Sequence, residues 1–323
     1  MNKVEVNNHV AVSAERLAQL ERSIQSVIRG KDEVIQLALV TLFARGHLLI
    51  EDVPGVGKTT LAHSLARSFN CAFQRIQFTS DMLPSDVIGI SVFSQQTQQF
   101  EFRQGPIFAN VVLADEINRT TPKTQSALLE AMNEYQVTAD NHTYPLPQPF
   151  MVIATQNPIE HHGTYPLPES QLDRFLLRLK VGYPARESEK EILHNFADSE
   201  PLAKIVPVMG AEEVVEIQHA VRRVTVDEQL VNYTLTLVEK TRQHEYLSLG
   251  VSPRGSMMLY RAGQALAFVE GRTYCIPDDF KRLASPVLAH RCIVSSRFVS
   301  TLKKSDQAEA ILKEILDSTP VPL

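Results

Sequence analysis

The 323-residue chain has no tryptophan and only three cysteines, Cys71, Cys275 and Cys292. The cysteines lack the close pairing that holds a zinc ion, so we expect reduced thiols and neither a disulfide framework nor a cysteine metal site. No apolar run approaches the roughly 18 residues that a membrane-spanning helix needs, and no signal-peptide pattern opens the sequence. These absences predict a cytoplasmic protein without a membrane segment.

An excess of basic residues is also missing. The formal net charge is −5, with 32 Lys and Arg against 37 Asp and Glu. This balance, together with the lack of a cluster that combines aromatic and basic residues, makes nucleic acid an unexpected partner. The remaining composition is that of an ordinary globular chain, 44% hydrophobic and 21% charged. The length predicts two domains.

A phosphate-binding loop is predicted within residues 47–60, HLLIEDVPGVGKTT. An apolar run is followed by a glycine-rich turn and then by a helical pattern that begins at Lys58. In such a loop, backbone N–H groups turn towards phosphate oxygens, and the helix N-terminus adds partial positive charge. Lys58 is then placed to reach the β- and γ-phosphates of a nucleotide, and the Thr59 hydroxyl to bind Mg²⁺. The candidate nucleotide-binding residues of the loop are Asp52, Pro54, Gly55, Val56, Gly57, Lys58, Thr59 and Thr60.

This loop departs from the general pattern at one position. Asp52 stands where the pattern G-x-x-x-x-G-K-[ST] has its first glycine, while Gly57, Lys58 and Thr59 match it. Taken alone, the segment also fits an ordinary strand–turn–helix corner with a surface lysine. The loop alone favours nucleotide binding over this alternative, and a second chemical signal strengthens the prediction.

Two acidic residues, Asp115 and Glu116, provide that signal, because they follow a continuous apolar run at residues 111–114. Such a run is typical of a buried parallel strand, and ligands bind at the carboxyl ends of these strands. Alternation along the strand predicts that the two carboxylates point to opposite sides. One is suited to hold Mg²⁺ and the other to polarise an attacking water. The alternative is a strand end with two solvated acids.

Three further polar residues are candidates on weaker signals. Asn157 follows a predicted strand at residues 150–155, where an amide is placed to orient water or contact a γ-phosphate, although asparagine before proline is also a common turn. Arg174 lies on the surface between a predicted short helix and a predicted fifth strand, and matters only if a neighbouring subunit's phosphate faces it. Arg254 falls in the first turn of a helix at residues 253–269, against the helix dipole, which indicates an anionic partner or a simple salt bridge.

The character of the sequence changes near Pro184. Residues 1–184 combine predicted helices, strands and two hairpins, whereas residues 185–323 contain only helical patterns, so we predict two domains with these bounds. The hairpins are expected near residues 91–103, with a glutamine-rich tip, and 137–144. The other predicted strands cover residues 48–50, 73–79, 111–114, 150–155 and 176–181. The predicted C-terminal helices cover residues 187–196, 212–221, 227–243, 253–269 and 277–291.

In combination, five segments resemble the AAA+ ATPases, and more narrowly the MoxR family. They are EDVPGVGKT (51–59), LADEINR (113–119), ATQNP (154–158), TYPLPESQLDRF (164–175) and SPRG (252–255). The resemblance implies an α/β P-loop core with a five-stranded parallel sheet, carrying a helix-2 insert and a pre-sensor 1 hairpin, followed by an all-helical lid. It also implies that the strand before Asn157 lies between the P-loop strand and the Asp115 strand. Asp52 is the form associated with this family.

The resemblance also implies a role for each candidate residue. Lys58 and Thr59 would be the Walker A lysine and Mg²⁺ ligand, Asp115 the second Mg²⁺ ligand, and Glu116 the Walker B base. Asn157 would be the sensor 1 residue, and Arg174 an arginine finger acting on the next subunit's ATP. Arg254 would be the sensor 2 arginine that the lid brings to the γ-phosphate. The turn formed by Ile28, Arg29 and Gly30 would contact adenine.

The implied function is that of an ATP-hydrolysing, chaperone-like remodeller with ATP and Mg²⁺ as cofactors. It would act as a homo-oligomer, expected to be a hexameric ring, on protein clients and together with a von Willebrand A-domain partner. One alternative is a magnesium-chelatase-like motor subunit, and another, from a different class, is a nucleotide-dependent binding switch with little turnover. A nucleic-acid motor is disfavoured by the acidic balance, and a small-molecule kinase by a helical lid that carries a sensor-type arginine.

Overall fold

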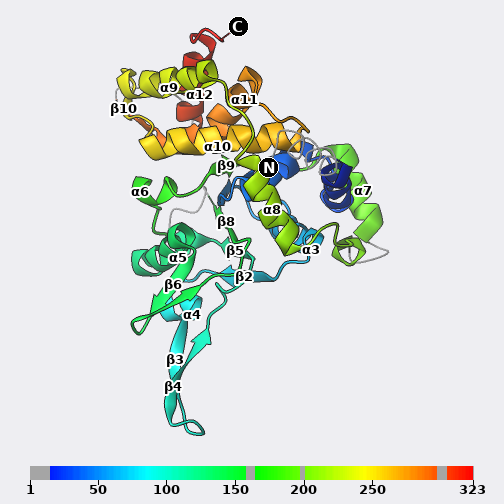
Figure 1. The fold of residues 1–323 in the computed structure, drawn as a ribbon, viewed down its shortest axis with the longest axis vertical. Coiled ribbons are helices and arrows are strands. Elements are labelled where there is room, and N and C mark those ends of the chain that lie inside the picture. Colours follow the sequence, from blue (N-terminus) through cyan, green and yellow to red (C-terminus); the bar gives the residue numbers. More distant parts are fainter. Residues whose placement is uncertain (1–14, 158–163, 197–200, 297–303, 323) are drawn as a thin grey trace.

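A parallel sheet of five strands forms the centre of the N-terminal part in the computed structural model, which describes residues 15–157, 164–196, 201–296 and 304–322 (Figure 1). The strand order is β2-β5-β8-β1-β9, so β8 lies between β1 and β5 as predicted. Because four of the strands are apolar over most of their length, they are buried on both faces. The strands are β1 (Leu48–Glu51), β2 (Phe73–Gln77), β5 (Val111–Asp115), β8 (Met151–Gln156) and β9 (Leu177–Leu179).

Helices cover both faces of this sheet. Leu48 and Leu113 point to one face and pack with α2 and α3, whereas Leu49 and Val112 point to the other and pack with α5. The period of two along each strand therefore feeds two separate apolar layers. The covering helices are α2 (Asp32–Phe43), α3 (Lys58–Ser68) and α5 (Pro122–Glu134), and residues 15–25 form a further helix.

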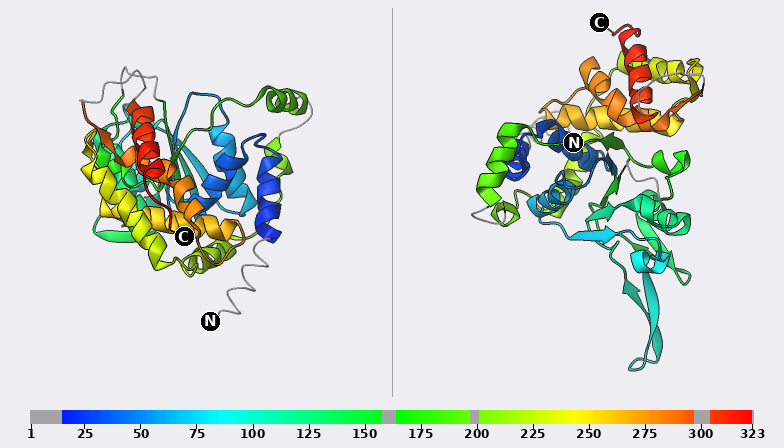
Figure 2. Two further views of the ribbon diagram at one scale, coloured as in Figure 1. Left: turned by 90° about the horizontal axis from the view of Figure 1, so that it is seen from above. Right: turned by 180° about the vertical axis from the view of Figure 1, so that it is seen from behind.

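Two antiparallel hairpins interrupt the core where the sequence predicted them. The longer one, β3 (Gly89–Ser94) with β4 (Gln99–Gln104), follows the short helix α4 (Pro84–Ile88) and protrudes from the end of the molecule opposite the C-terminal helices (Figures 1 and 2). The shorter one pairs β6 (Gln136–Ala139) with β7 (His142–Pro145). Both inserts leave the five-stranded order of the sheet intact.

The described C-terminal residues form helices, a short antiparallel pair, β10 (Leu247–Leu249) with β11 (Ile293–Val294), and an isolated bridge between Thr225 and Tyr274. The sequence did not predict these pairings. A last helix, α12 (Lys304–Asp317), was missed as well, although Ala308, Ile311 and Ile315 give it a buried stripe. The predicted domain boundary near Pro184 falls between β9 and α7 and stays a prediction. No described helix is long and apolar enough to cross a membrane. The remaining elements are α6 (Glu169–Leu172), α7 (Arg186–Phe196), α8 (Ala211–Val221), α9 (Glu228–Gln243), α10 (Pro253–Val269), α11 (Pro277–Leu288), α12 (Lys304–Asp317), and the 3₁₀ turns Ile117–Arg119, Pro201–Lys204 and Ala289–Arg291.

Candidate active site

The loop between β1 and α3 has the backbone of an anion-binding turn. Gly55 has φ +84° and Gly57 has φ +90°, in the left-handed region that glycine adopts without strain. No side chain caps α3, and its first intrahelical hydrogen bond runs from Leu61 N to Gly57 O at 2.9 Å. The N–H groups of Lys58, Thr59 and Thr60 therefore have no carbonyl partner in the preceding turn and are placed to bind an anion.

Lys58 lies at the start of α3, beside the acids of the sheet. Its Nζ donates a hydrogen bond to the backbone oxygen of Asp52 at 2.8 Å. Burial lowers the pKa of Lys58, and the negative charges of Asp115, Asp52 and Glu116 act in the opposite direction. The ammonium group is thus partly desolvated, which strengthens its attraction for a phosphate.

The Asp52 side chain is used inside the protein. Its Oδ1 accepts a hydrogen bond from Val53 N, and its Oδ2 accepts one from Gly182 N, just after β9. The residue is only 8% exposed. Asp52 therefore ties the beginning of the loop to the segment that follows the edge strand, a contact that glycine has no side chain to make.

Asp115 ends β5 as a nearly buried carboxylate with partners on both oxygens. Its Oδ1 accepts a hydrogen bond from the Thr155 hydroxyl at 2.6 Å. Its Oδ2 accepts two from Arg75 on β2, from Nη2 at 2.6 Å and from Nε at 3.1 Å. The carboxylate is therefore fixed by two neighbouring strands, β8 and β2.

Glu116 corrects one prediction, because its carboxylate lies on the same side as that of Asp115. The strand ends at Asp115, and Glu116 has φ +57°, which breaks the alternation. Its backbone N–H donates to the Thr155 hydroxyl at 2.9 Å. Its Oε2 accepts a hydrogen bond from Gln77 at 3.0 Å and pairs with Arg119 at 3.1 Å.

The loop and the strand ends together enclose a cavity of about 370 Å³. Most of the residues predicted to bind or cleave a nucleotide line this one cavity, and Arg75 joins them without having been predicted. The described lining residues are Pro54, Gly55, Gly57, Lys58, Thr59, Thr60, Arg75, Asp115, Glu116 and Asn157.

The oxygens at this cavity suit Mg²⁺ only in company with a ligand. The Thr59 hydroxyl and the Asp115 carboxylate are the hard donors that Mg²⁺ prefers. The described part of the chain has no group of three or more His, Cys, Asp or Glu side chains that would hold a metal by itself. The residues therefore fit an ion that takes its other ligands from phosphate oxygens and water.

Several predicted residues lie outside the cavity. Val56 packs against the apolar core, and Asp52 is engaged as described above. The turn formed by Ile28, Arg29 and Gly30 lies against α7, where a side chain at Gly30 would clash with the Ser188 hydroxyl. This turn is near the phosphate loop. The adjoining Lys31 donates to Tyr183 O at 2.8 Å, and the residue before Tyr183, Gly182, donates its N–H to Asp52. Its predicted contact with adenine stays a prediction.

Arg174 lies near the amino ends of the strands, whereas the phosphate loop lies at their carboxyl ends. β9 pairs with β1 in parallel with Leu177 beside Leu48, and Leu176 N donates to His47 O at 2.8 Å. Arg174 therefore lies level with the amino end of β1, whereas the phosphate loop follows its carboxyl end. Four residues of strand, roughly 13 Å, separate the two levels.

Arg254 lies with Arg174 and not with the loop. The Ser252 hydroxyl, which caps α10, donates to the carboxylate of Asp173 at 3.2 Å. In Figure 1, α6 and β10, which flank this start of α10, are on the left, and α3 is on the right. The resemblance implied that the lid brings Arg254 to the γ-phosphate. In this structure the lid does not carry Arg254 to the cavity of its own chain.

The surroundings of Arg174 differ from those expected of a solvated arginine. The side chain is half-buried, its Nη1 donates to Leu129 O on α5, and its Nε makes no hydrogen bond within the described residues. Burial lowers the pKa of Arg174, and the positive charge of Arg254 lowers it further. The negative charges of Glu130 and Glu134 act in the opposite direction, so Arg174 lies among charges of both signs.

Arg75, Gln77 and Thr155 were missed by the sequence analysis, although a signal was present. Arg75 and Gln77 are two positions apart on one strand, so both side chains leave the same face. Their meaning depends on β2 lying beside β5, with Gln77 level with Asp115. Sequence alone does not give that pairing, so two polar side chains on a strand carried no assignment.

Comparison with known proteins relates this chain to AAA ATPases. The family model for the ATPase family associated with various cellular activities (AAA) matches residues 47–177, and that for an AAA lid domain matches residues 239–315. Chaperone MoxR1 of Mycobacterium tuberculosis is 40% identical over 94% of this chain and 82% of its own length. The uncharacterized protein YeaC of Bacillus subtilis is 49% identical over 95% of both chains.

A solved structure agrees with the fold. The crystal structure of a candidate ATPase from Cytophaga hutchinsonii superposes with a TM-score of 0.90 at 36% identity, covering 98% of both chains. It includes the sheet, the inserts and the helical C-terminal part, since almost all of both chains is matched. With a P-loop cavity between acidic strand ends, and with relatives matched along nearly its whole length, this chain belongs to the MoxR family of AAA+ ATPases.

Proposed function

We propose that the chain binds ATP with Mg²⁺ in the P-loop cavity and hydrolyses it. The observation that carries this proposal is the meeting of opposite chemistries in one cavity: free N–H groups and Lys58 on one side, and the carboxylates of Asp115 and Glu116 on the other. The N–H groups and Lys58 bind phosphate oxygens. Mg²⁺, bound through Thr59 and Asp115, would neutralise phosphate charge.

Glu116 is the base in this proposal. Its carboxylate is acceptor-only when ionised, so it orients an attacking water and takes up a proton from it. Asn157 directly follows β8, lines the same cavity and is placed to hold that water or the γ-phosphate. Gln77 and Arg119 both contact Oε2 of Glu116 and so orient the carboxylate that would take up the proton.

Two variants test the assignment. Lys58→Ala should lose ATP binding in a fluorescent-nucleotide titration, because the phosphates lose their main cation. Glu116→Gln should bind ATP as the wild type does and release phosphate at least about 10²-fold more slowly, in the range for loss of a general base. Unchanged ATP affinity in Lys58→Ala, or undiminished turnover in Glu116→Gln, contradicts the proposal.

We further propose that each ATP site is completed by a neighbouring chain. Arg174 and Arg254 lie together at the amino edge of the sheet and away from their own cavity, which supports their action on the nucleotide of the next subunit. An arginine supplied in this way is worth roughly 10³–10⁵ in rate. A head-to-tail arrangement that closes on itself gives a ring, for which we propose six subunits.

The proposed biological role is chaperone-like remodelling of protein clients, with a von Willebrand A-domain partner. The name of the Mycobacterium tuberculosis relative supports the role. The protruding β3–β4 hairpin supports it as well, since the exposed Phe93 and Phe100 rings stack edge to face 5.4 Å apart. An ATP-loaded Glu116→Gln assembly should retain a client that the wild type releases. Equal retention with ADP contradicts remodelling driven by ATP.

A further inference from the structure

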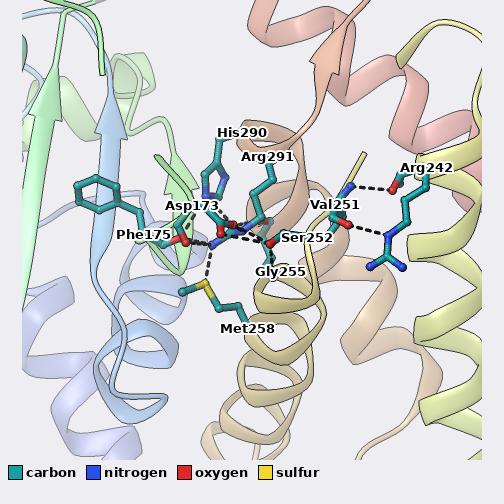
Figure 3. A network of polar contacts seen from close by, with 11 residues as sticks. Asp173, Phe175, Arg242, Val251, Ser252, Gly255, Met258, His290 and Arg291 are labelled. Atoms are coloured by element: carbon teal, nitrogen blue, oxygen red, sulfur yellow. Dashed lines mark hydrogen bonds and ion pairs between the residues drawn. The ribbon is translucent and has the colours of Figure 1, made fainter. Parts of the chain in front are cut away.

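The loop that carries Arg174 is held from the lid by one buried arginine. Arg291 follows α11, and its side chain is only 1% exposed. Its Nε donates to Asp173 Oδ1 at 2.9 Å, and its Nη2 donates to the backbone oxygens of Asp173 and Phe175 (Figure 3). Arg291 thus contacts the residue on either side of Arg174.

The neighbours of Arg291 reinforce this contact. Its Nη1 donates to Val287 O, back along α11. The ring of His290 donates from Nε2 to the same Phe175 oxygen at 3.1 Å, and burial keeps this ring neutral by lowering its pKa well below the usual value. Burial also lowers the pKa of Arg291 to about 10, so the guanidinium remains charged near neutral pH.

Asp173 connects the same loop to the helix that carries Arg254. Its carboxylate accepts the hydroxyl of Ser252, which in turn caps α10 by accepting Gly255 N at 3.2 Å. A side chain at Gly255 would meet Arg291 Cδ at 2.9 Å, so glycine is needed for α10 to approach this closely. One carboxylate therefore joins the loop, the start of α10 and the end of α11.

We propose that Arg291 is a positioning residue for the neighbouring chain's ATP site: through Asp173 it fixes Arg174 and Arg254 as one rigid unit that moves with the lid. The inference rests on the proposed function, in which both arginines act on the next subunit. A buried ion pair adds little to stability compared with apolar packing, so a gain in geometric precision is the better reason for it here. Only the planar fork of arginine can bind the carboxylate and the carbonyls together.

The test separates the chain that gives the arginines from the chain that binds ATP. Donor chains carry Lys58→Ala, so they bind no ATP but offer their arginines. Acceptor chains carry Arg174→Ala, so they bind ATP but offer no finger. In an equal mixture, turnover arises only where a donor's arginines face an acceptor's cavity. Arg291→Lys is then added either to the donors or to the acceptors.

We expect the mixed rate to fall about 10- to 100-fold when the donors carry Arg291→Lys, because a shift of about 1 Å in a catalytic group can lower the rate by about 10²-fold. The same change in the acceptors should alter neither the mixed rate nor the affinity of the acceptors for ATP. Arg272→Lys in the donors is the matched control, since Arg272 makes another lid ion pair, with Asp279 and Glu270. If Arg291→Lys fails to fold, Asp173→Asn takes its place.

The outcomes distinguish the two proposals. Suppose that the mixture is active and that Arg291→Lys lowers its rate equally in donors and acceptors, or lowers it in neither. Either result overturns the positioning role and leaves the split site standing. A mixture that is inactive even without Arg291→Lys, although both chains assemble, overturns the split site and the positioning role with it.

Discussion

At the residue scale, Arg75 is the least expected member of the cavity. Its guanidinium binds Oδ2 of Asp115, the carboxylate proposed to hold Mg²⁺, through hydrogen bonds of 2.6 and 3.1 Å. The Arg75 side chain is 48% exposed, so solvent screens this ion pair, which is worth at most about 1 kcal/mol. In the proposed site, the arginine would therefore compete with the cation without preventing its binding.

Arg75→Gln should lower the Mg²⁺ concentration that gives half-maximal ATP hydrolysis by roughly 2- to 5-fold, because the competing charge is removed from Asp115. The measurement is a Mg²⁺ titration of phosphate release at saturating ATP. Arg67→Gln, an exposed arginine on α3, is the control and should leave the titration unchanged. A higher Mg²⁺ requirement in Arg75→Gln contradicts competition and indicates that Arg75 helps to bind the nucleotide.

His47 is a second residue whose state is set by its surroundings. Its Nε2 donates to Met132 O at 2.9 Å, and its Nδ1 accepts Val152 N at 3.0 Å, which requires the neutral ring. Burial lowers the pKa of His47 to about 4. In the unfolded chain His47 binds a proton near its ordinary pKa of 6.5. The contribution of neutral His47 to the free energy of unfolding is therefore fully present above pH 6.5 and is lost as the pH falls towards 4.

Between pH 7 and pH 5, His47 alone should reduce the free energy of unfolding by about 2 kcal/mol. Urea unfolding at the two pH values measures the change. In His47→Gln, which is less stable at pH 7 but has no proton to gain at this position, the pH dependence should be smaller by about that amount. An equal pH dependence in both chains would show that His47 is not the titrating group.

At the element scale, the sequence predicted the parts that local patterns determine. The apolar run before Asp115, the glycine turn before Lys58 and the proline after Ser252 each specify one element from neighbouring residues. Arg75 was missed because its role depends on strand pairing. Glu116 was predicted on the wrong side because its positive φ is a property of the folded strand end. Arg254 was expected at its own chain's nucleotide because spacing gives no placement of the lid.

The junction between the phosphate loop and the edge of the sheet gives an element-scale prediction. Asp52→Ala removes the acceptor of Val53 N and Gly182 N, so it should reduce stability by about 1–3 kcal/mol and also weaken ATP binding, since the loop is no longer fixed. Asp227→Ala is the control, because it removes the cap of α9 at about 1 kcal/mol but should leave ATP affinity unchanged. Unaltered ATP affinity in Asp52→Ala would show that this contact serves stability alone.

At the scale of the whole molecule, the chain presents two complementary faces. One holds the cavity with Asp115 and Glu116, and the other carries Arg174 and Arg254 at the opposite edge of the sheet. In the proposed assembly, the arginines of one copy would meet the nucleotide of the next. The formal net charge of −5 does not reveal this division, because it sums the two faces.

The most direct test of the split site is the rate of ATP hydrolysis per chain over a dilution series, with mass followed by light scattering in the same samples. If each site needs a neighbour's arginines, the rate per chain should fall together with the mass as assemblies dissociate. Chains that scatter as 36.2 kDa monomers should then be inactive. Full turnover by such monomers would contradict the account.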